Sequence, residues 1–375
     1  MRETELRRLL VEEFLSFVED PRVERTRKHS LETILVLSLL AVLSGADTFV
    51  EVERYGEAKK DWLSTFLDLD NGVPSHDTIG RVFALLSTGQ LVQAFQQWTQ
   101  ALATTTRGKL VAIDGKTLRR SFKHAGEHAF VHMVSAWSHA NQAVLGQVKV
   151  DDKSNEVTAI PALLDLLDVR NALVTIDAAG TQVEIAEKIV DKGGDYLLAL
   201  KANQPTLYAS VVAYFEDRRG GRVLDMHETH EKAHGREETR RAWVSNTIVS
   251  IESAKRWKGL STVICIESTR VVRGVTTTEL RYYISSRVLT AKKALHAVRS
   301  HWGIENGLHW VLDTAFREDD SRIRAGNAAA NFSALRAFAL SLLKQRTDVK
   351  VGIKIKRSMA GWDHNFLLQT IGILV

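Results

Sequence analysis

The stretch HWGIENGLHWVLDTAFREDD, residues 301–320, governs the interpretation of the whole chain because it sets a carboxylate inside an apolar pattern. Residues spaced three and four apart through this region predict one face of a helix. The members of that face are Leu295, Val298, Trp302, Glu305, His309, Leu312 and Phe316. Glu305 and His309 are the ionisable ones. A buried carboxylate is costly unless it is paired, protonated or bound to a metal, so we expect the sequence to supply partners for Glu305.

Two aspartates elsewhere are candidate partners, because each follows a short apolar run typical of a strand. Asp114 follows LVAI and Asp177 follows LVTI, and small residues come after both. An aspartate in such a place is also a common turn residue. Two of them in one predicted sheet, together with Glu305, form a hard oxygen donor set that suits Mg²⁺ or Mn²⁺. Two such ions can promote phosphodiester chemistry without a covalent protein nucleophile.

Other interpretations of the glutamate region stay open at this point. Glu305 could form a buried ion pair with His301 or His309, each one helical turn away. The same three residues could bind zinc, although the HExxH pattern is absent and the two aspartates would then have no explanation. The acidic residues that follow are expected to be a solvated end of the helix, and these are Asp313, Glu318, Asp319 and Asp320.

Hydrophobic periodicity divides the chain into regions with helical patterns and regions with strand patterns. Residues 1–100 read as helices, and SHDTIGRVFALL within them could be the second helix of a DNA-reading helix-turn-helix or a packing helix. From Lys109 the order reads as three strands followed by alternating helices and strands, which predicts an α/β fold with a mixed sheet flanked by helices. We expect a helical N-terminal domain at residues 1–100 and a core in two parts, at 101–205 and 290–345. A β-rich insertion at 206–289 separates the two parts, and a basic tail follows at 346–375.

Composition and charge restrict the class of protein. The chain has 375 residues, 50 Lys and Arg against 45 Asp and Glu, and a formal net charge of +5, a mild excess that allows a polyanionic partner without requiring one. Its single cysteine, Cys265, excludes an intrachain disulfide and a cysteine-based zinc ribbon, and suits a reducing cytoplasm. The most apolar run, which starts at Ile34, is shorter than the roughly 20 residues of a membrane span, so we expect no membrane partner. Ser30 is a candidate N-cap for this run.

Several motifs together resemble one known family. They are AIDGKTLRRS, KSNEVTAIPALL, VTIDAAGTQ, LLALKANQ and HWGIENGLHWVLDTAFREDDSRIR, and they extend over nearly the whole chain. In their order and residue sequence, these motifs resemble the H-repeat-associated, ISAs-type insertion-sequence transposases of the DDE class. The resemblance implies a ribonuclease-H-like core, with Asp114, Asp177 and Glu305 as its catalytic, metal-binding triad. Broader relatives carry tyrosine, arginine and lysine where this chain has Val298, His301 and Leu312, so their DNA contacts cannot be transferred.

The function implied by the resemblance is metal-dependent DNA cleavage at insertion-sequence ends, followed by strand transfer into target DNA. Mg²⁺ is the expected cofactor, with Mn²⁺ as a substitute. The expected partners are double-stranded DNA, namely the terminal inverted repeats and the target, and a second copy of the chain on that DNA. A bacterial cytoplasmic location, at the nucleoid when DNA is bound, is implied too. A nuclease of the same fold and a domesticated or inactive DNA-binding relative are the alternatives.

Residues near the predicted triad are candidates for DNA contacts, because cations beside a phosphodiester site can position the backbone. A solvated basic loop is the alternative for the segment after Asp114, and core packing is the alternative for the tryptophan, which could otherwise stack on an unpaired base. The candidates are Lys116, Arg119, Arg120, Lys123, Lys201, Asn203, Trp257 and His301.

Overall fold

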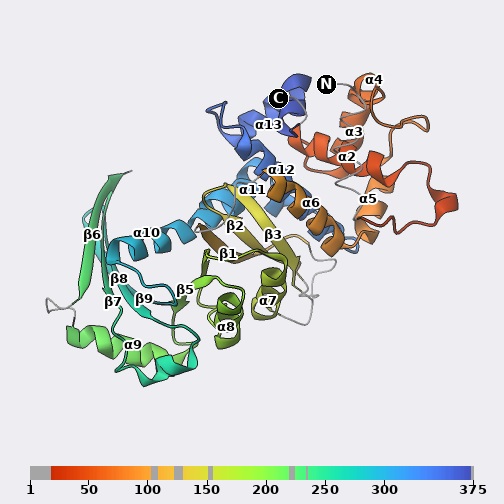
Figure 1. Cartoon of the computed structure of the whole chain (residues 1–375). Helices are drawn as coiled ribbons and strands as arrows, with labels where there is room; N and C mark the ends of the chain where they lie inside the picture. Colours follow the sequence, from red (N-terminus) through yellow and green to blue (C-terminus); the bar gives the residue numbers. More distant parts are fainter. Residues whose placement is uncertain are drawn as a thin grey trace.

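The computed structural model describes residues 18–102, 109–121, 130–150, 155–218, 224–233 and 235–372, with the backbone alone for residues 26, 98–102 and 218. Within these ranges, nine strands form one sheet in the order β3-β2-β1-β4-β5-β9-β8-β7-β6 (Figure 1). The strands are β1 (Leu110–Thr117), β2 (His132–Ser138), β3 (Ala143–Lys149), β4 (Leu173–Ile176), β5 (Asp195–Leu200), β6 (Asp225–Ala233), β7 (Arg236–Ser245), β8 (Thr262–Val272) and β9 (Val275–Ser285).

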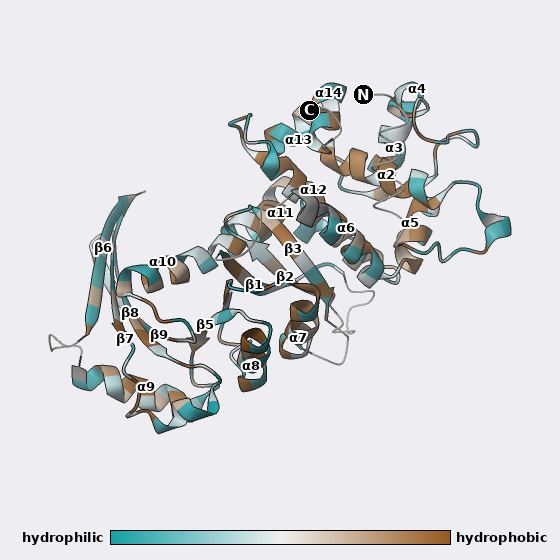
Figure 2. Cartoon of the chain, viewed as in Figure 1, coloured by the Kyte–Doolittle hydropathy of each residue, from teal (hydrophilic) through white to brown (hydrophobic). Residues whose placement is uncertain are grey.

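The first five strands confirm the predicted mixed sheet. β1, β2 and β3 form an antiparallel meander, while β4 and β5 add parallel to β1. The connections before β4 and β5 are the helices α7 (Glu156–Leu166) and α8 (Val183–Asp191). This is the ribonuclease-H-like arrangement that the sequence motifs imply. Figure 2 shows brown stretches on β1 and β3, because a sheet covered by helices on both faces needs apolar side chains on both sides.

The β-rich region extends the same sheet. β9 pairs antiparallel with β5, and β8, β7 and β6 follow outward by antiparallel pairing. A helix not expected from the sequence, α9 (Pro205–Arg218), precedes these strands. Strand β6 was not expected either, because its residues DMHETHEKA are polar on both faces and carry no apolar alternation. The part of the sheet nearest β5 is buried, whereas the outer part of β9 is exposed along its whole first half.

Helices cover both faces of the sheet (Figure 1). On one face lie α7, α8 and α9 with the short helix η4 (Glu252–Arg256), and on the other lie α6 (Thr88–Leu102), α10 (Ala291–His301) and α12 (Ala328–Gln345). α10 crosses both halves of the sheet, since it contacts β1 and β4 as well as β6 and β7. This helix therefore leads the chain from the β-rich half of the sheet to the strands β1 and β4.

The N-terminal helices and the last helices form one helical body around a shared core. Its other members are α2 (Leu31–Leu43), α3 (Phe49–Ala58), α4 (Lys60–Leu63), α5 (His76–Leu85), α13 (Ile353–Trp362) and α14 (His364–Thr370), with the short helix η3 (Glu24–Thr26) before them. Ser30 caps α2 as predicted, because its side chain accepts a hydrogen bond from the Thr33 N–H at 3.0 Å. α5, the helix-turn-helix candidate, buries Ile79, Val82 and Phe83 and packs against α3 and α12. Its apolar face is therefore used for packing.

The C-terminal segment, expected to be a basic tail, is folded, and several of its cations are internal. Arg357 is 4% exposed and donates to the carbonyl oxygens of Val42 and Ala46, each at 3.0 Å, and to the Asp47 carboxylate at 2.8 Å. Lys356 donates to backbone carbonyl groups near the end of α12. These cations satisfy the ends of helices, so their charge is not displayed to a partner. In the described part of the chain, no helix is both long and apolar enough to cross a membrane.

Candidate active site

Asp114 and Asp177 lie side by side at one edge of the sheet. β1 and β4 are parallel and their register pairs Ile113 with Ile176, so the next residue on each strand is an aspartate. β4 ends at Ile176, as predicted. β1 continues to Thr117 beside β2, with Asp114 opposite Ser135, so the prediction that Asp114 ends its strand is wrong. The two aspartates are accessible at this end of the strands because β4 stops at Ile176, while β1 continues beside β2 to Thr117.

The turn after β4 holds Asp177 in place. Its Oδ1 accepts hydrogen bonds from the N–H groups of Ala179 at 3.0 Å and Gly180 at 3.2 Å. The Asn203 side chain donates to the carbonyl oxygen of Ala178 at 2.6 Å. Asp177 therefore stabilises the turn, as the sequence allowed, and it also lines the pocket with Asp114. Asn203, a candidate for DNA contact, uses its amide group inside this turn.

Glu305 reaches the same edge from a break in the helix that crosses the sheet. α10 ends at His301, a π-helical turn η5 spans Glu305–His309, and α11 (Trp310–Ala315) follows. In this turn the Trp310 N–H bonds to the Glu305 carbonyl, five residues back. The Glu305 side chain is 55% exposed, and Trp302, which lies before this turn, is 48% exposed. The prediction of one continuous buried face from Leu295 to Phe316 is therefore wrong, because the helix is interrupted between α10 and α11.

Asp114, Glu305 and His309 form a tight group. One ligand atom from each lies within 4.8 Å of the others. The Nδ1 atom of His309 is 3.6 Å from Asp114 Oδ2 and 3.6 Å from Glu305 Oε2. Three or more acidic, His or Cys side chains with a spacing that suits a metal ion are found, among the described residues, at this place. The sequence pattern pointed to His309 only as an ion-pair partner or a zinc ligand.

The electrostatics of the group favour an added positive charge. Burial raises the pKa of Asp114 to about 7, and the charges of Glu305 and Asp177 add to the rise against the opposing effect of His309. Next to it, the His309 imidazole holds the pKa of Glu305 below its usual value. A half-buried carboxylate crowded by two others is a place where a divalent cation would be stabilised. The donor set of carboxylate oxygens and one imidazole nitrogen therefore fits a divalent metal ion.

A pocket of ≈ 460 Å³ opens over the group. Asp114, Asp177 and Glu305 all line it, together with residues of β5, β9 and α10. Trp302, 48% exposed, forms part of the wall with Arg281, whose guanidinium lies 5.3 Å from the indole ring centre. The Lys201 side chain, exposed at the end of β5, lines it as well. The pocket thus combines the three carboxylates with cationic and aromatic groups, and Arg281 is itself paired with Glu279 in the lining.

His301 lies in this pocket but outside the metal-spaced group. Its Nδ1 is 2.9 Å from the Thr175 hydroxyl, and burial lowers the pKa of its imidazole. The zinc site considered from the sequence required His301, Glu305 and His309 together, and the described structure groups Asp114 with Glu305 and His309 instead. His301 therefore acts as a pocket wall fixed to β4.

Lys116 ties the strand that carries Asp114 to the helix that carries His309. Its Nζ forms ion pairs with Asp313 and, at 2.9 Å, with Glu318, and lies 3.4 Å from the His309 carbonyl oxygen. The Glu318 side chain is 1% exposed. Burial opposes ionisation of Glu318, but the charges of Lys116 and Arg336 outweigh it and lower its pKa. The expectation that this acidic segment is a solvated helix end is wrong for Glu318. Lys116, a candidate for DNA contact, forms internal ion pairs in the structure.

The other predicted cations differ in their availability. The Arg119 side chain is 79% exposed, 3.2 Å from Asp319, and the Arg120 side chain is 49% exposed, 3.4 Å from Asp320. Both side chains lie at the surface next to the acidic segment, and neither lines the pocket. Lys123 lies outside the described residues.

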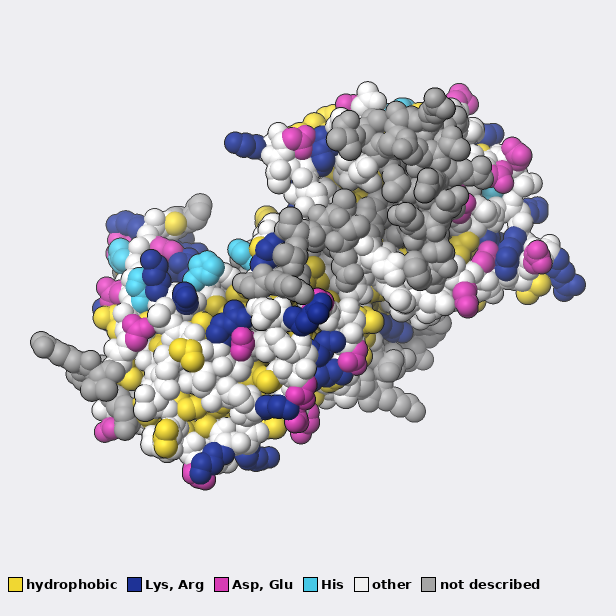
Figure 3. All heavy atoms as spheres, in the orientation of Figure 1, with side chains coloured by type: hydrophobic (Ala, Val, Ile, Leu, Met, Phe, Trp, Pro, Cys, Tyr) yellow, Lys and Arg dark blue, Asp and Glu magenta, His cyan; other side chains and the backbone are white. Residues whose placement is uncertain are grey.

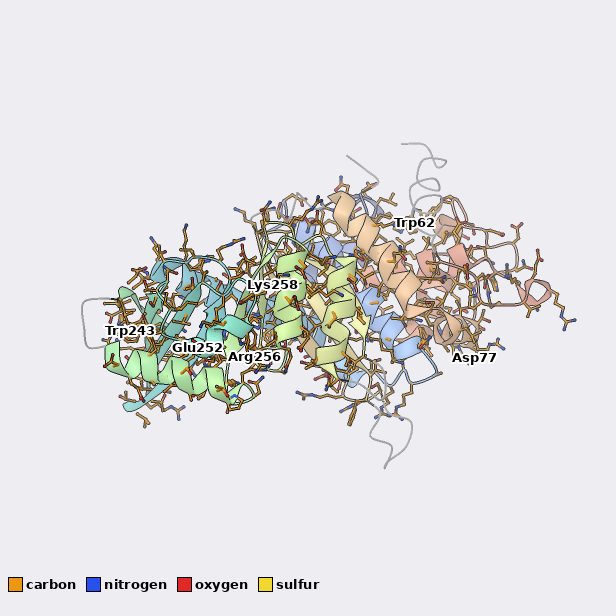
Figure 4. The ribbon with its side chains drawn as sticks, turned by 60° about the horizontal axis from the view of Figure 1, so that its bottom comes forward. Trp62, Asp77, Trp243, Glu252, Arg256 and Lys258 are labelled. Atoms are coloured by element: carbon orange, nitrogen blue, oxygen red, sulfur yellow. The ribbon has the colours of Figure 1, made fainter. Side chains whose placement is uncertain are left out.

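Trp257 is 4% exposed and belongs to the core beneath α9, as the packing alternative predicted. Figure 4 labels its neighbours Glu252, Arg256 and Lys258 on η4 and the turn that follows. Lys258 pairs with Asp191 at the end of α8. The indole is therefore enclosed by the protein and has no face turned to a base.

Comparison with known proteins identifies the family. Residues 105–342 match the family model described as "Transposase DDE domain", and residues 12–99 match the model described as "DDE_Tnp_1-associated". The chain is 44% identical to "Putative transposase YncI" of Escherichia coli O157:H7, over 92% of this chain and 90% of that protein. It is 39% identical to "H repeat-associated putative transposase YhhI" of Escherichia coli (strain K12), over 98% of both.

A structural neighbour is the chain in a cryo-EM structure of a piggyBac transposase synaptic complex with hairpin DNA. Its TM-score is 0.46 at 8% identity, over 98% of this chain and 80% of that one. The match of the family model to more than half of the sequence, and the relatives that align along nearly its full length, lead to one assignment: the chain belongs to the transposase DDE-domain family.

Proposed function

We propose that this chain is a Mg²⁺-dependent transposase that cuts DNA at the ends of its own element and joins those ends to target DNA. The observation that carries the proposal is the meeting of Asp114, Asp177 and Glu305 at one pocket, although they are far apart in sequence. Membership of the DDE family supports the same conclusion. Mn²⁺ is expected to replace Mg²⁺.

The proposed chemistry has two displacements at phosphorus. In the first, a water oxygen attacks a phosphodiester, the bond to the 3′ oxygen breaks, and the element end keeps a 3′-hydroxyl. In the second, that hydroxyl attacks a target phosphodiester, forming a new P–O bond and releasing a target 3′-hydroxyl. Divalent ions bound by the carboxylates would activate the attacking oxygen and stabilise the leaving one.

The residues of the chain bind and position. Asp114 and Asp177, fixed on adjacent strands, would hold the metal ions, and Glu305 on its π-helical turn would complete the site. Lys116 would keep β1 and α11 at a constant separation through its buried ion pairs. His301, anchored on Thr175, would form the wall against which the scissile strand lies.

DNA contact is proposed for the exposed cations near the pocket, namely Arg119, Arg120 and Lys201. The Asp320 partner of Arg120 is 51% exposed, so exchanging this carboxylate for a phosphate costs little. Figure 3 shows Lys and Arg side chains scattered among acidic ones over the visible face, which favours several small contacts over one basic patch. Because two element ends must be joined together, we propose a homodimer on DNA, at the nucleoid of a bacterial host.

The test uses the purified full chain, a duplex with the inverted repeat of its own element, and Mg²⁺, with the products sized on a denaturing gel. Asp114→Asn, Asp177→Asn and Glu305→Gln should abolish cleavage and leave DNA binding largely intact. Asp165→Asn, which removes an exposed carboxylate of α7 paired with Lys188 at 2.7 Å, is the matched control and should cleave normally. Cleavage retained by any of the three triad variants would contradict the proposal.

The same assay separates the alternatives. Cleavage without any joined product, when target DNA is supplied, would indicate a nuclease of this fold. Binding without cleavage by the unaltered chain, in either Mg²⁺ or Mn²⁺, would indicate a DNA-binding relative that has lost its chemistry.

A further inference from the structure

The His309 ring is buried next to the carboxylates without an ordinary hydrogen bond. The residue is 5% exposed. Its Nε2 is buried and has no hydrogen-bond partner among the described residues. Its Nδ1 faces two carboxylate oxygens at 3.6 Å each, longer than the ordinary N–H···O range. The gap between Nδ1 and these two carboxylate oxygens is surrounded by the donor atoms that a bound cation requires.

The backbone around His309 is built to aim the ring at the carboxylates. The π-helical turn contains both Glu305 and His309, and such turns are rare and concentrate at functional sites. Lys116 of β1 also contacts this turn, since its Nζ lies 3.4 Å from the His309 carbonyl oxygen. The ring is therefore positioned by two independent features, one local and one through β1.

We propose that His309 is a metal ligand through Nδ1, sharing one divalent ion with Asp114 and Glu305. This inference rests on the proposed function and adds a nitrogen donor to its carboxylate site. The three ligand atoms lie within 4.8 Å of one another. Ligand bonds of about 2.0–2.2 Å allow two donors of one ion to be at most roughly 4.4 Å apart, so only a small contraction is needed.

The nitrogen donor changes which ions the site prefers. Mg²⁺ binds oxygen ligands almost exclusively, whereas first-row transition ions accept imidazole more readily. A site of two carboxylates and one imidazole should therefore hold Mn²⁺ more tightly than an all-carboxylate site would. Removing the imidazole should weaken Mn²⁺ binding about tenfold or more, and Mg²⁺ binding much less.

The test measures coordination directly. Mn²⁺ is added to the full chain, and pulsed EPR detects magnetic coupling between the ion and directly bound nitrogen. Coupling to ¹⁴N is expected in the unaltered chain, and replacement by ¹⁵N coupling after labelling of histidine alone. The coupling should disappear in His309→Gln and in Asp114→Asn. His296→Gln, at an exposed histidine of α10, is the matched control and should keep it.

Each outcome decides the proposal. Loss of nitrogen coupling in His309→Gln with retention in His296→Gln supports it. Mn²⁺ bound without nitrogen coupling in the unaltered chain overturns it, as does coupling that persists in His309→Gln. If His309→Gln does not fold, His301→Gln in the histidine-labelled chain gives the answer: ¹⁵N coupling that persists supports His309 as the ligand, whereas coupling that disappears assigns the nitrogen to His301 and overturns the proposal. DNA cleavage together with absent nitrogen coupling would reject His309 as a ligand and leave the proposed function standing, whereas absent cleavage would reject the function itself.

Discussion

Replacing Lys116 by methionine tests whether the internal ion pairs hold the site together. Lys116→Met keeps most of the side-chain volume and removes the charge that faces Glu318 at 2.9 Å. The Glu318 carboxylate, 1% exposed, would then be left with Arg336 as the cation acting on it. Removing one partner of a buried pair typically costs about 3–5 kcal/mol of unfolding free energy.

Protonation of Glu318 decides how much of this loss depends on pH. The usual pKa of a glutamate is 4.5, and each unit between that value and the solution pH costs about 1.4 kcal/mol. Keeping Glu318 neutral in the variant therefore costs roughly 3.4 kcal/mol at pH 7 and roughly 0.7 kcal/mol at pH 5, in addition to the stabilisation that the lowered pKa gives the unaltered chain at both values. We therefore expect Lys116→Met to lose about 3 kcal/mol or more at pH 7, and a loss that is smaller by up to about 2.7 kcal/mol at pH 5.

The sign of the pH effect follows from the lowered pKa of Glu318 in the folded protein. The unaltered chain keeps this stabilisation above the unfolded pKa and loses it only as pH falls through the lower folded value. In the variant, burial without Lys116 raises the pKa of Glu318, so acid relieves the penalty. The two proteins should therefore converge in stability as pH falls from 7 to 5.

The measurement is urea unfolding at both pH values and constant ionic strength, followed by tryptophan fluorescence. Arg119→Met is the matched control, because its side chain is 79% exposed and its pair with Asp319 should contribute less than about 1 kcal/mol. A Lys116→Met loss below about 1 kcal/mol at pH 7, or a loss that does not change with pH, would refute the reasoning.

Three further predictions concern the frame and the surface. Arg357→Met should lower the unfolding free energy by about 3 kcal/mol or more, measured by urea unfolding, because it leaves the Asp47 carboxylate and several carbonyl groups unpaired. Gly326→Ala should cost about 1–3 kcal/mol, seen as a lower thermal midpoint, since φ is +50° and a Cβ would lie 2.5 Å from the Ala84 carbonyl oxygen. The double variant Arg119→Gln/Arg120→Gln should flatten the logarithmic salt dependence of DNA binding by about 1 per lost phosphate contact, measured by fluorescence anisotropy, and an unchanged slope would mean that neither arginine contacts DNA.

Local patterns predicted the elements that bear the carboxylates. Apolar runs that stop at Asp114 and Asp177 predicted two strands, and β1 and β4 contain or precede these residues. The periodicity around Glu305 predicted a helix, and α10 and α11 flank it. The metal-binding role of the three residues stays a prediction until it is tested.

Errors arose wherever one extra residue or a distant partner decided the outcome. The helix is interrupted between α10 and α11, and Glu305, expected on a buried face, is half-exposed there. A single inserted residue is invisible to a periodicity that is read over many residues. β6 escaped prediction because its place at the sheet edge allows polar side chains on both faces.

By itself, the sequence determined the mixed sheet, the order of strands and helices from β1 to β5, and which carboxylates follow apolar runs, because these depend on side-chain periodicity within short segments. The tertiary structure alone decided that His309 joins Asp114, that Lys116 pairs with Glu318, and that Trp257 is enclosed. The reason is physical. Burial and pairing depend on residues hundreds of positions apart, and a lysine or histidine has the same local pattern whether its partner is a carboxylate, a metal ion or water.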